Sequence, residues 1–140
     1  VVLGPQDDHF FPQGLVTFLS TPYRIGTASN RIGYRLVGAA IKHRGPADIV
    51  SDGIPLGAVQ VPSGGQPILM MADRPTIGGY AKVATVVTAD IPLLAQLFPG
   101  VSQVRFRATT VAESQASHRK QIAELTRALE GQEVDYERGR

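Results

Sequence analysis

Lys82 stands just before an apolar run and three residues after a Gly-Gly pair, a spacing that can hold an anion. In a glycine-rich turn, the backbone N–H groups of Gly78 and Gly79 can line up on a carboxylate. A lysine beside such a turn supplies a point charge for a carboxylate or for a developing oxyanion. Thr76 and Tyr80 add donors at the same strand edge. The stretch is therefore either an ordinary tight turn with charged edges or the wall of a polar site.

Three more polar side chains interrupt apolar segments of the chain. Asp73 and Arg74 follow the apolar run 68–72, and burying either one without a partner would be costly. Either they pair with each other or cap strand ends, or they line the site. Gln60 lies inside the alternating segment "GAVQVP", and a buried carboxamide needs hydrogen-bond partners. Gln60 is therefore either a structural staple or a group that reads a substrate.

Other catalytic motifs are absent from the sequence. The histidines His9, His43 and His118 have no metal-ligand spacing, and there is no Cys, so we expect no metal site. The serine motifs GxSxG and SxxK do not occur, and neither does a Walker A pattern. These absences leave the Gly-Gly and lysine stretch as the main candidate site.

Charge and hydropathy exclude two classes of partner. The chain has 14 basic and 12 acidic residues, and neither its first 100 residues nor the rest forms a basic field, so we expect no nucleic-acid partner. No apolar run approaches the roughly 18 residues of a membrane span, and no signal peptide is visible. We therefore predict a cytoplasmic protein without a membrane partner. The chain starts at Val1 in a strand-like segment, which predicts a fragment, a processed chain or part of a larger one.

The elements that must position these residues are mainly short strands. With 15 Gly and 10 Pro, the chain is rich in turns, which favours many strands over a helix bundle. Aromatic residues make up only 6% of the chain, so we expect an aliphatic core. Asp52-Gly53 is expected to be a turn between strands. The strands are predicted over residues 1–3, 23–25, 31–37, 48–51, 57–61, 68–72, 81–88 and 101–109.

Three helices complete the prediction. Asp7 or Asp8 is expected to begin a helix that runs through residue 19, although Pro12 and Gly14 weaken this prediction. Asp90 is expected to open a short helix, and one C-terminal helix is predicted over residues 112–130. The fold class is therefore mainly β, a barrel or sandwich with appendages.

Four segments together resemble a known family. They are "GPQDDHF", "SNRIGYRLVG", the long block "SDGIPLGAVQVPSGGQPILMMADRPTIGGYAKVATV" and "QLFPG" followed by "VRFRA". In this order they are similar to the C-terminal half of the C subunit of 5-oxoprolinase, a family also called KipA-type or allophanate hydrolase subunit 2-like. The same module is similar to part of the carboxyltransferase domain of urea amidolyase. The resemblance covers residues 1–113, and residues 114–140 are predicted to be a variable helical tail.

The resemblance implies a cyclophilin-like β-barrel and a multi-subunit enzyme. It implies an N-terminal half of the same protein with a related fold, and as partners a KipI-type protein similar to the B subunit and a LamB/YcsF-like protein, which is the A subunit. Together these open 5-oxoproline to glutamate with ATP as co-substrate, whereas the urea amidolyase domain passes a carboxyl group to urea. No metal and no biotin is expected on this chain.

The resemblance also implies roles for the residues singled out above. Lys82 and Asp73 are the implied catalytic residues, with Lys82 and the glycine N–H groups holding a carboxylate, carbonyl or phosphate oxygen. Gln60 and Asp73 would hydrogen-bond an amide or ureido N–H, and Arg74 would orient Asp73. The implied substrate-binding residues are Gln60, Arg74, Thr76, Gly78, Gly79 and Tyr80.

At three positions the sequence departs from the family pattern. Asn30 replaces a more common Asp, which keeps an Asx turn but removes a charge beside Arg31. Ile77 replaces a threonine and so offers no hydroxyl to a ligand. Ala81 stands where the family usually has proline.

Two competing classes of function remain from the sequence. The KipA-type name marks regulatory proteins that antagonise a kinase inhibitor, which would make the chain an interaction module without chemistry. A plain small-molecule-binding barrel, whose enzyme partner lies elsewhere, is the other alternative.

Overall fold

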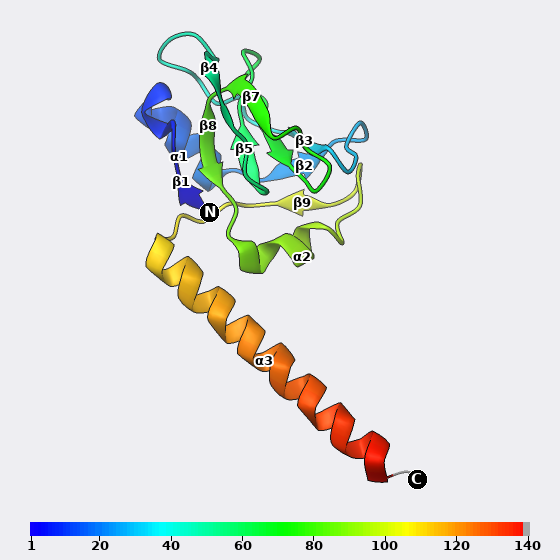
Figure 1. Ribbon diagram of the computed structural model, residues 1–140. Helices are drawn as coiled ribbons and strands as arrows, with labels where there is room; N and C mark the ends of the chain where they lie inside the picture. Colours follow the sequence, from blue (N-terminus) through cyan, green and yellow to red (C-terminus); the bar gives the residue numbers. More distant parts are fainter. Residues whose placement is uncertain (139–140) are drawn as a thin grey trace.

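A seven-stranded antiparallel sheet curls into a half-barrel and forms the body of the molecule (Figure 1). The computed structural model describes residues 1–138, with side chains through residue 130. The prediction of a mainly β barrel with short helices and a C-terminal helix is confirmed in this half-barrel form. In spatial order the strands are β1 (Val2–Leu3), β8 (Lys82–Thr85), β5 (Ala58–Gln60), β6 (Ile68–Met70), β3 (Gly33–Val37), β2 (Tyr23–Ile25) and β9 (Gln103–Val104).

Two further strands pair with each other and form a second sheet of their own. β4 (Asp48–Gly53) pairs antiparallel with β7 (Ile77–Tyr80), and their register shifts between Asp48 and Asp52. We call this pair the β4–β7 arm. The predicted turn at Asp52-Gly53 is wrong, because both residues pair with β7 at the end of β4, and of the two alternatives for the Gly-Gly stretch the tight turn is excluded, because both glycines lie within β7. Pairing between segments about 25 residues apart has overridden the local turn signals.

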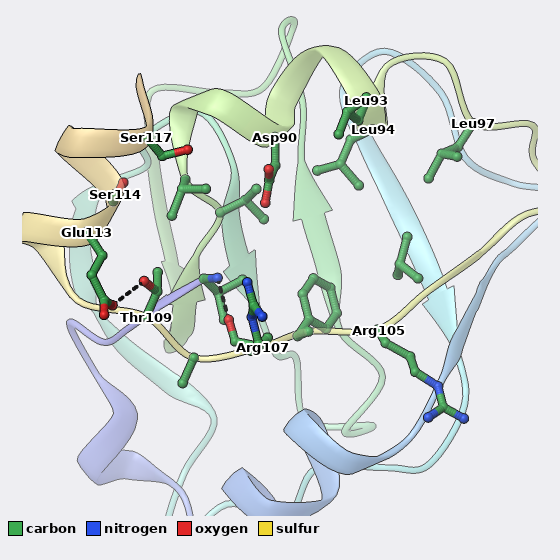
Figure 2. Close-up of a pocket in the computed structure, with 16 residues that line it drawn as sticks. Asp90, Leu93, Leu94, Leu97, Arg105, Arg107, Thr109, Glu113, Ser114 and Ser117 are labelled. Atoms are coloured by element: carbon green, nitrogen blue, oxygen red, sulfur yellow. Dashed lines mark hydrogen bonds between the residues drawn. The ribbon is translucent and has the colours of Figure 1, made fainter. Parts of the chain in front are cut away.

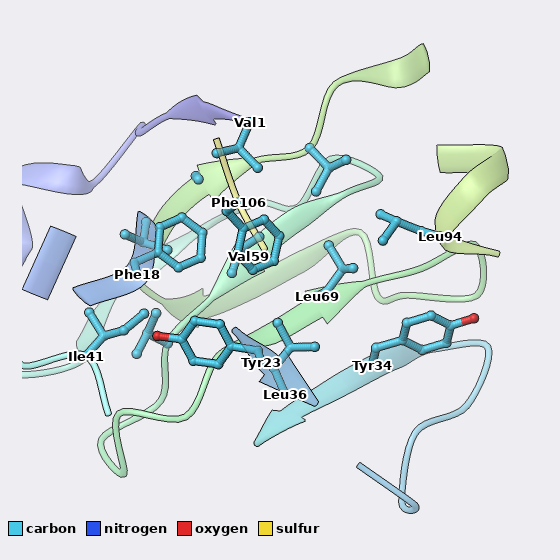
Figure 3. Packing of buried hydrophobic residues seen from close by; sticks show 14 of the residues in the cluster. Val1, Phe18, Tyr23, Tyr34, Leu36, Ile41, Val59, Leu69, Leu94 and Phe106 are labelled. Atoms are coloured by element: carbon cyan, nitrogen blue, oxygen red, sulfur yellow. The ribbon is translucent and has the colours of Figure 1, made fainter. Parts of the chain in front are cut away.

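The core is mainly aliphatic, but its largest buried side chains are aromatic (Figure 3). Phe18 from α1 stacks on Phe106 with ring centroids 4.5 Å apart, and Tyr23 of β2 lies 6.2 Å from Phe106. The Tyr23 hydroxyl donates to the carbonyl oxygen of Ala39 at 3.0 Å, which satisfies the one polar atom of the ring. The expectation of a mainly aliphatic core is therefore confirmed, with one aromatic cluster of Phe18, Tyr23 and Phe106 where α1 packs on the sheet.

The first helix begins later than predicted. A 3₁₀ turn, η1 (Asp7–His9), comes first, and α1 (Pro12–Ser20) starts only after it. Pro12 occupies the first helical position, where its missing N–H is not needed and its fixed φ suits the helix. Gly14 is buried, and a Cβ there would lie 3.1 Å from the Lys42 carbonyl oxygen. The two residues that weakened the prediction therefore begin the helix and let it approach the neighbouring loop.

The other helices lie at one end of the half-barrel. η2 (Thr88–Asp90) leads into α2 (Ile91–Leu94), and α3 (Val111–Arg138) follows β9 after an extended segment. Thr110 and Glu113 form a reciprocal capping box, with the Glu113 N–H donating to Thr110 Oγ1 and the Thr110 N–H donating to Glu113 Oε2. Residues 105–109, predicted as part of a strand, form no described strand.

The C-terminal helix leaves the body of the molecule (Figure 1). Its first turns pack on η2, where Gln121 Nε2 donates to the Ala89 carbonyl oxygen at 3.3 Å. Beyond this contact the apolar stripe of Ile122, Leu125 and Leu129 is exposed. The C-terminal helix predicted over residues 112–130 is thus confirmed, and it extends to Arg138; residues 139 and 140 lie outside the described part of the chain.

Candidate functional site

Gln60 and Lys82 are the buried polar side chains of the described core, with exposed fractions of 4% and 1%. They lie opposite each other on the paired strands β5 and β8. The pairing is irregular between Val59 and Gln60, and the two side chains have different partners: the Lys82 ammonium contacts Asp52, and the Gln60 carboxamide contacts the Tyr80 carbonyl oxygen. The fold therefore buries an ammonium and a carboxamide on neighbouring strands.

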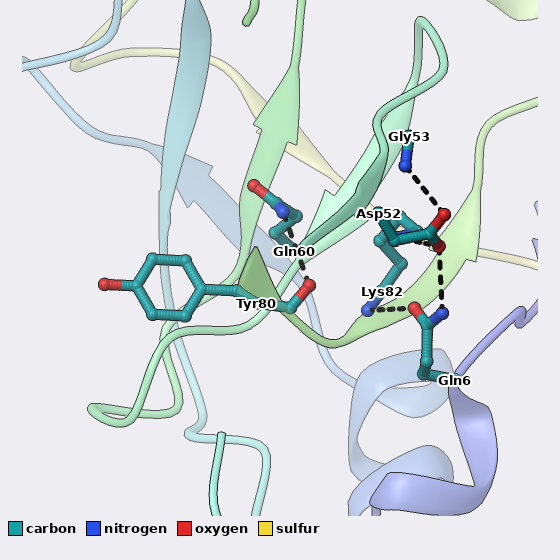
Figure 4. Close-up of polar contacts among 6 residues, drawn as sticks. All are labelled: Gln6, Asp52, Gly53, Gln60, Tyr80 and Lys82. Carbon is teal, nitrogen blue, oxygen red and sulfur yellow. Dashed lines mark hydrogen bonds and ion pairs between the residues drawn. The ribbon is translucent and has the colours of Figure 1, made fainter. Parts of the chain in front are cut away.

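Lys82 is held by two residues that the sequence analysis did not select (Figure 4). Its Nζ lies 2.9 Å from Asp52 Oδ2, and Gln6 Nε2 donates to the same carboxylate oxygen at 3.3 Å. The Lys82 backbone N–H donates to Gln6 Oε1 at 3.1 Å. Hydrogen bonds from the Lys82 ammonium, the Gly53 N–H and Gln6 lower the pKa of Asp52 below its usual range, so this carboxylate stays ionised. Asp52 is half-exposed, and it therefore connects the buried ammonium with the surface.

Gln60 is covered by the other strand of the arm. Its Nε2 donates to the Tyr80 carbonyl oxygen at 3.3 Å, and this carbonyl partner fixes which end of the amide is the donor. A Cβ on Gly78 would lie 3.1 Å from Gln60 Nε2 and 2.5 Å from Ile54 Cδ1. Gly78 therefore allows β7 to pass closely over the carboxamide. Both buried polar residues thus have partners in the β4–β7 arm.

The predicted interaction of Arg74 with Asp73 is wrong. Asp73 accepts from Arg31 at 2.8 and 3.2 Å, and this pair is exposed. Arg74 instead donates from Nε to the Ile54 carbonyl oxygen at 2.9 Å. The hydrogen bond with Arg31 lowers the pKa of Asp73, and the same contact raises the pKa of Arg31.

The remaining predicted residues lie on the arm and the segment before it. Thr76 is exposed and accepts a backbone hydrogen bond from the Ile54 N–H. The Tyr80 ring points away from Gln60 and Lys82 (Figure 4). Gly79 lies in β7 within the irregular part of its pairing with β4, and Ile77 is exposed. The structure thus brings Gln60, Gly78 and Lys82 together, and the other side chains lie outside this cluster.

The sequence contained a weak signal for one of the two missed residues, Asp52. A lysine at the start of an apolar strand needs a counter-ion if it is buried, and Asp52 is one of only a few acids in the matching block. Asp52 was missed because the dipeptide with Gly53 reads as a turn. Gln6 lies 76 residues from Lys82 along the chain, so its role follows only from the fold. The predicted Asx turn does form, since Asn30 Oδ1 accepts from the Ile32 N–H at 2.9 Å.

A separate cavity of about 680 Å³ lies at the helical end of the half-barrel (Figure 2). Its walls include α2, the segment 104–109 and the first turns of α3. The charged side chains that line it are Asp90, Arg105, Arg107 and Glu113. A hydrogen bond from Thr109 lowers the pKa of Glu113. None of the residues predicted as a site lines this cavity. Over the side chains that the structure describes, no cluster of His, Asp or Glu could hold a metal ion.

The comparisons with known proteins identify the family. Residues 1–108 match the family model "Carboxyltransferase domain, subdomain A and B", and the chain belongs to this family.

Its relatives include components of two enzyme systems. The chain is 44% identical over 92 residues to the C subunit of 5-oxoprolinase from Haemophilus influenzae, covering 66% of this chain and 29% of the relative. It is 39% identical over 94 residues to the C subunit of 5-oxoprolinase from Escherichia coli, covering 67% of this chain and 30% of the relative. The chain thus spans less than a third of these proteins. The crystal structure of K. lactis urea amidolyase superposes with a TM-score of 0.76 at 25% identity, over 82% of this chain and 8% of that one.

A helix that spans a membrane must be long and apolar, and the described helices are not of this kind. Within residues 1–138, none combines the length and the apolar character that crossing a bilayer requires.

Proposed function

We propose that the chain is a module of an ATP-dependent 5-oxoprolinase, which opens the lactam ring of 5-oxoproline to give glutamate. In this reaction water adds to the ring carbonyl carbon, the C–N bond breaks, and the ring nitrogen leaves as the amine of glutamate. ATP is the co-substrate that the complex hydrolyses. The identity with the C subunits of two 5-oxoprolinases over the block that contains Gln60 and Lys82 supports this assignment.

The observation that carries the proposal is the pair of buried polar side chains on β5 and β8. An ammonium in a site shielded from water stabilises a carboxylate or a developing oxyanion far more strongly than it would in bulk solvent. The carboxamide of Gln60 beside it can hydrogen-bond the amide of a small planar substrate. In our proposal Lys82 holds the negatively charged oxygen, and Gln60 orients the amide. Direct roles for Asp73, Arg74, Thr76, Gly79 and Tyr80 stay predictions.

The proposal includes partners that complete the site. We infer a module of related fold, equivalent to the N-terminal half of the relatives' polypeptide, facing the β5–β8 site. A KipI-type protein similar to the B subunit and a LamB/YcsF-like protein as the A subunit would complete the complex, in the cytoplasm. Binding of ATP is assigned to the complex, and this chain is proposed to bind neither metal nor biotin.

Reconstitution tests the proposal directly. The full-length protein is purified together with the KipI-type and LamB/YcsF-like proteins of the same genome, and glutamate release is measured with 5-oxoproline and ATP. We expect release only when all components and ATP are present. Urea and allophanate serve as competing substrates, and turnover of either one in place of 5-oxoproline would overturn the assignment. Binding of a kinase inhibitor without turnover of any of the three amides would favour the KipA-type regulatory alternative.

A further inference from the structure

The strand β4 covers the buried ammonium, and apart from Ile49, which packs against the core, its residues lie largely at the surface. Among the strands that the structure describes it pairs only with β7, and this pairing is irregular between Asp48 and Asp52. Most of its residues are exposed, and Val50 is almost completely so. Edge strands with a register irregularity and few buried contacts open at low free energy. Beyond its pairing with β7, the polar contacts of β4 with the body include those that Asp52 makes with Lys82 and Gln6.

The contact between Asp52 and Lys82 resembles a ligand contact. A carboxylate oxygen sits 2.9 Å from the Lys82 ammonium, and the Asp52 side chain remains 52% exposed to solvent. Gln6 supplies a second donor to the same oxygen. A carboxylate from outside the chain would find the same two donors if Asp52 moved aside. Asp52 therefore occupies the position in which the site would hold an anion.

The neighbouring Gln60 supplies the second half of the recognition. Its Nε2 is used by the Tyr80 carbonyl oxygen, whereas no hydrogen bond to its Oε1 is found among the residues that the structure describes. A carboxamide oxygen accepts N–H donors. The pair thus offers an ammonium for a carboxylate and, on the opposed strand, an acceptor for an N–H group.

We propose that β4 is a strap over an anion site formed by Lys82 and Gln60, and that a small carboxylate with an adjacent amide N–H displaces Asp52 from Lys82. The ligand class rests on the proposed function, since 5-oxoproline carries its ring N–H on the carbon next to its carboxylate. Asp52 then acts as a built-in competitor, which keeps the buried ammonium paired while the site is empty. An unpaired ammonium in this position would be strongly disfavoured.

Binding of three small probes to the full chain tests this proposal. The probes are 5-oxoproline, tetrahydrofuran-2-carboxylate, which lacks the N–H, and 2-pyrrolidinone, which lacks the carboxylate. Dissociation constants are measured by NMR titration for the wild type and for Asp52→Asn, a neutral substitution of the same shape. We expect Asp52→Asn to bind both carboxylates about tenfold more tightly, because the competing charge is gone, and to bind 2-pyrrolidinone unchanged. The matched control is Asp48→Asn, which removes an exposed acid from the same strand and should alter no affinity.

Two further variants assign the donors and acceptors. Lys82→Met should abolish the affinity for both carboxylates. Gln60→Met should remove the preference for 5-oxoproline over tetrahydrofuran-2-carboxylate and leave the carboxylate affinity itself in place. Weaker carboxylate binding by Asp52→Asn than by the wild type would overturn the proposal, because Asp52 would then position Lys82 for a ligand that binds elsewhere on it. Absence of carboxylate binding in both proteins would overturn it as well.

Two safeguards keep the test decisive. If Asp52→Asn does not fold, Asp52→Ser is measured in its place, and hydrogen exchange is followed in the wild type with and without saturating 5-oxoproline. When 5-oxoproline is bound, we expect faster hydrogen exchange at the amides of β4 and unchanged exchange in β5, whereas slower exchange in β4 would contradict displacement.

The binding experiment and the reconstitution experiment can fail separately. If the reconstituted complex fails to hydrolyse 5-oxoproline but the binding pattern holds, the proposed function is wrong and the proposed anion site under β4 is still supported.

Discussion

Two ion pairs, the guanidinium of Arg31 with Asp73 and the ammonium of Lys82 with Asp52, differ in what surrounds them. The exposed pair, Arg31 with Asp73, has side chains that are 82% and 50% exposed, and its N–O distance is 2.8 Å. The covered pair, Lys82 with Asp52, has a similar distance of 2.9 Å, but the ammonium is only 1% exposed. Water solvates both ions of the first pair whether or not they touch. In the second pair the ammonium depends on its protein partners, so the same contact has much greater consequences.

The difference in burial between the two pairs shows that charged residues within one short sequence block can have unrelated environments. Asp73 and Lys82 lie nine positions apart in the stretch that first suggested a site, yet the fold turns one toward solvent and buries the other. The acid that does serve the lysine is Asp52, which comes from another strand. Burial therefore distinguishes the candidate site residue Lys82 from the exposed Asp73, although both side chains are charged.

The largest effect is expected from removing the buried ammonium. Lys82→Ala leaves a cavity in the core and strips Asp52 of its partner, so we expect the free energy of unfolding to fall by about 3 kcal/mol. Lys82→Met keeps most of the side-chain volume and should recover much of that loss. Urea denaturation of the full chain measures both values, with Lys42→Ala, which truncates an exposed lysine, as the control. A loss no greater than that of Lys42→Ala would mean that Lys82 is not part of the core.

The close passage of β7 over Gln60 gives the next largest effect. Gly78→Ala places a methyl group 2.5 Å from Ile54 Cδ1 and 3.1 Å from Gln60 Nε2. Because the arm must shift to relieve this overlap, we expect a destabilisation of about 1–3 kcal/mol. Gly53→Ala is the control, since a Cβ at Gly53 would meet no atom within 4 Å. Equal unfolding free energies for the two variants would show that the arm is not packed closely on the carboxamide.

The sequence accounts for the scaffold better than for the site. Alternating and continuous apolar runs located β2, β3, β5, β6 and β8, because burial of one or both faces leaves a periodic trace in the sequence. β7 was missed, because Ile77 and two glycines carry no such trace, and its partner β4 ends on a dipeptide that favours a turn. Gln60 and Lys82 were found as polar residues within apolar segments. Their partners could not be found locally, since those contacts span 20, 30 and 76 residues.

Lowering the pH should weaken the ion pair between Asp52 and Lys82 and so lower the stability of the protein. Lys82 lowers the pKa of Asp52 from its ordinary value of 3.8, so its folded-state pKa lies below its unfolded-state pKa. The stability that Asp52 contributes is therefore fully present above about pH 4 and is lost as the pH falls through its folded-state pKa. We expect Asp52→Asn to flatten the dependence of Tm on pH below about pH 4, and Asp48→Asn to leave it unchanged. A slope equal to that of the wild type would contradict the assignment of Lys82 as its main partner.

The exposed pair should give the smallest effect. Arg31→Met or Asp73→Asn is expected to shift Tm by less than about 2 °C, and added salt should reduce the difference further. Differential scanning calorimetry at low and high ionic strength measures this shift. A Tm loss from Asp73→Asn as large as that from Asp52→Asn would remove the contrast between the two pairs.

The central claim is that the buried Lys82 serves the chemistry of the complex. The most direct test compares ATP-dependent glutamate release from 5-oxoproline by the reconstituted complex with Lys82→Met and with Lys42→Met, after thermal unfolding has shown that both proteins fold. We predict that Lys82→Met lowers kcat by about a hundredfold or more, and that Lys42→Met leaves it unchanged. A folded Lys82→Met protein that supports turnover at the wild-type rate would contradict the account.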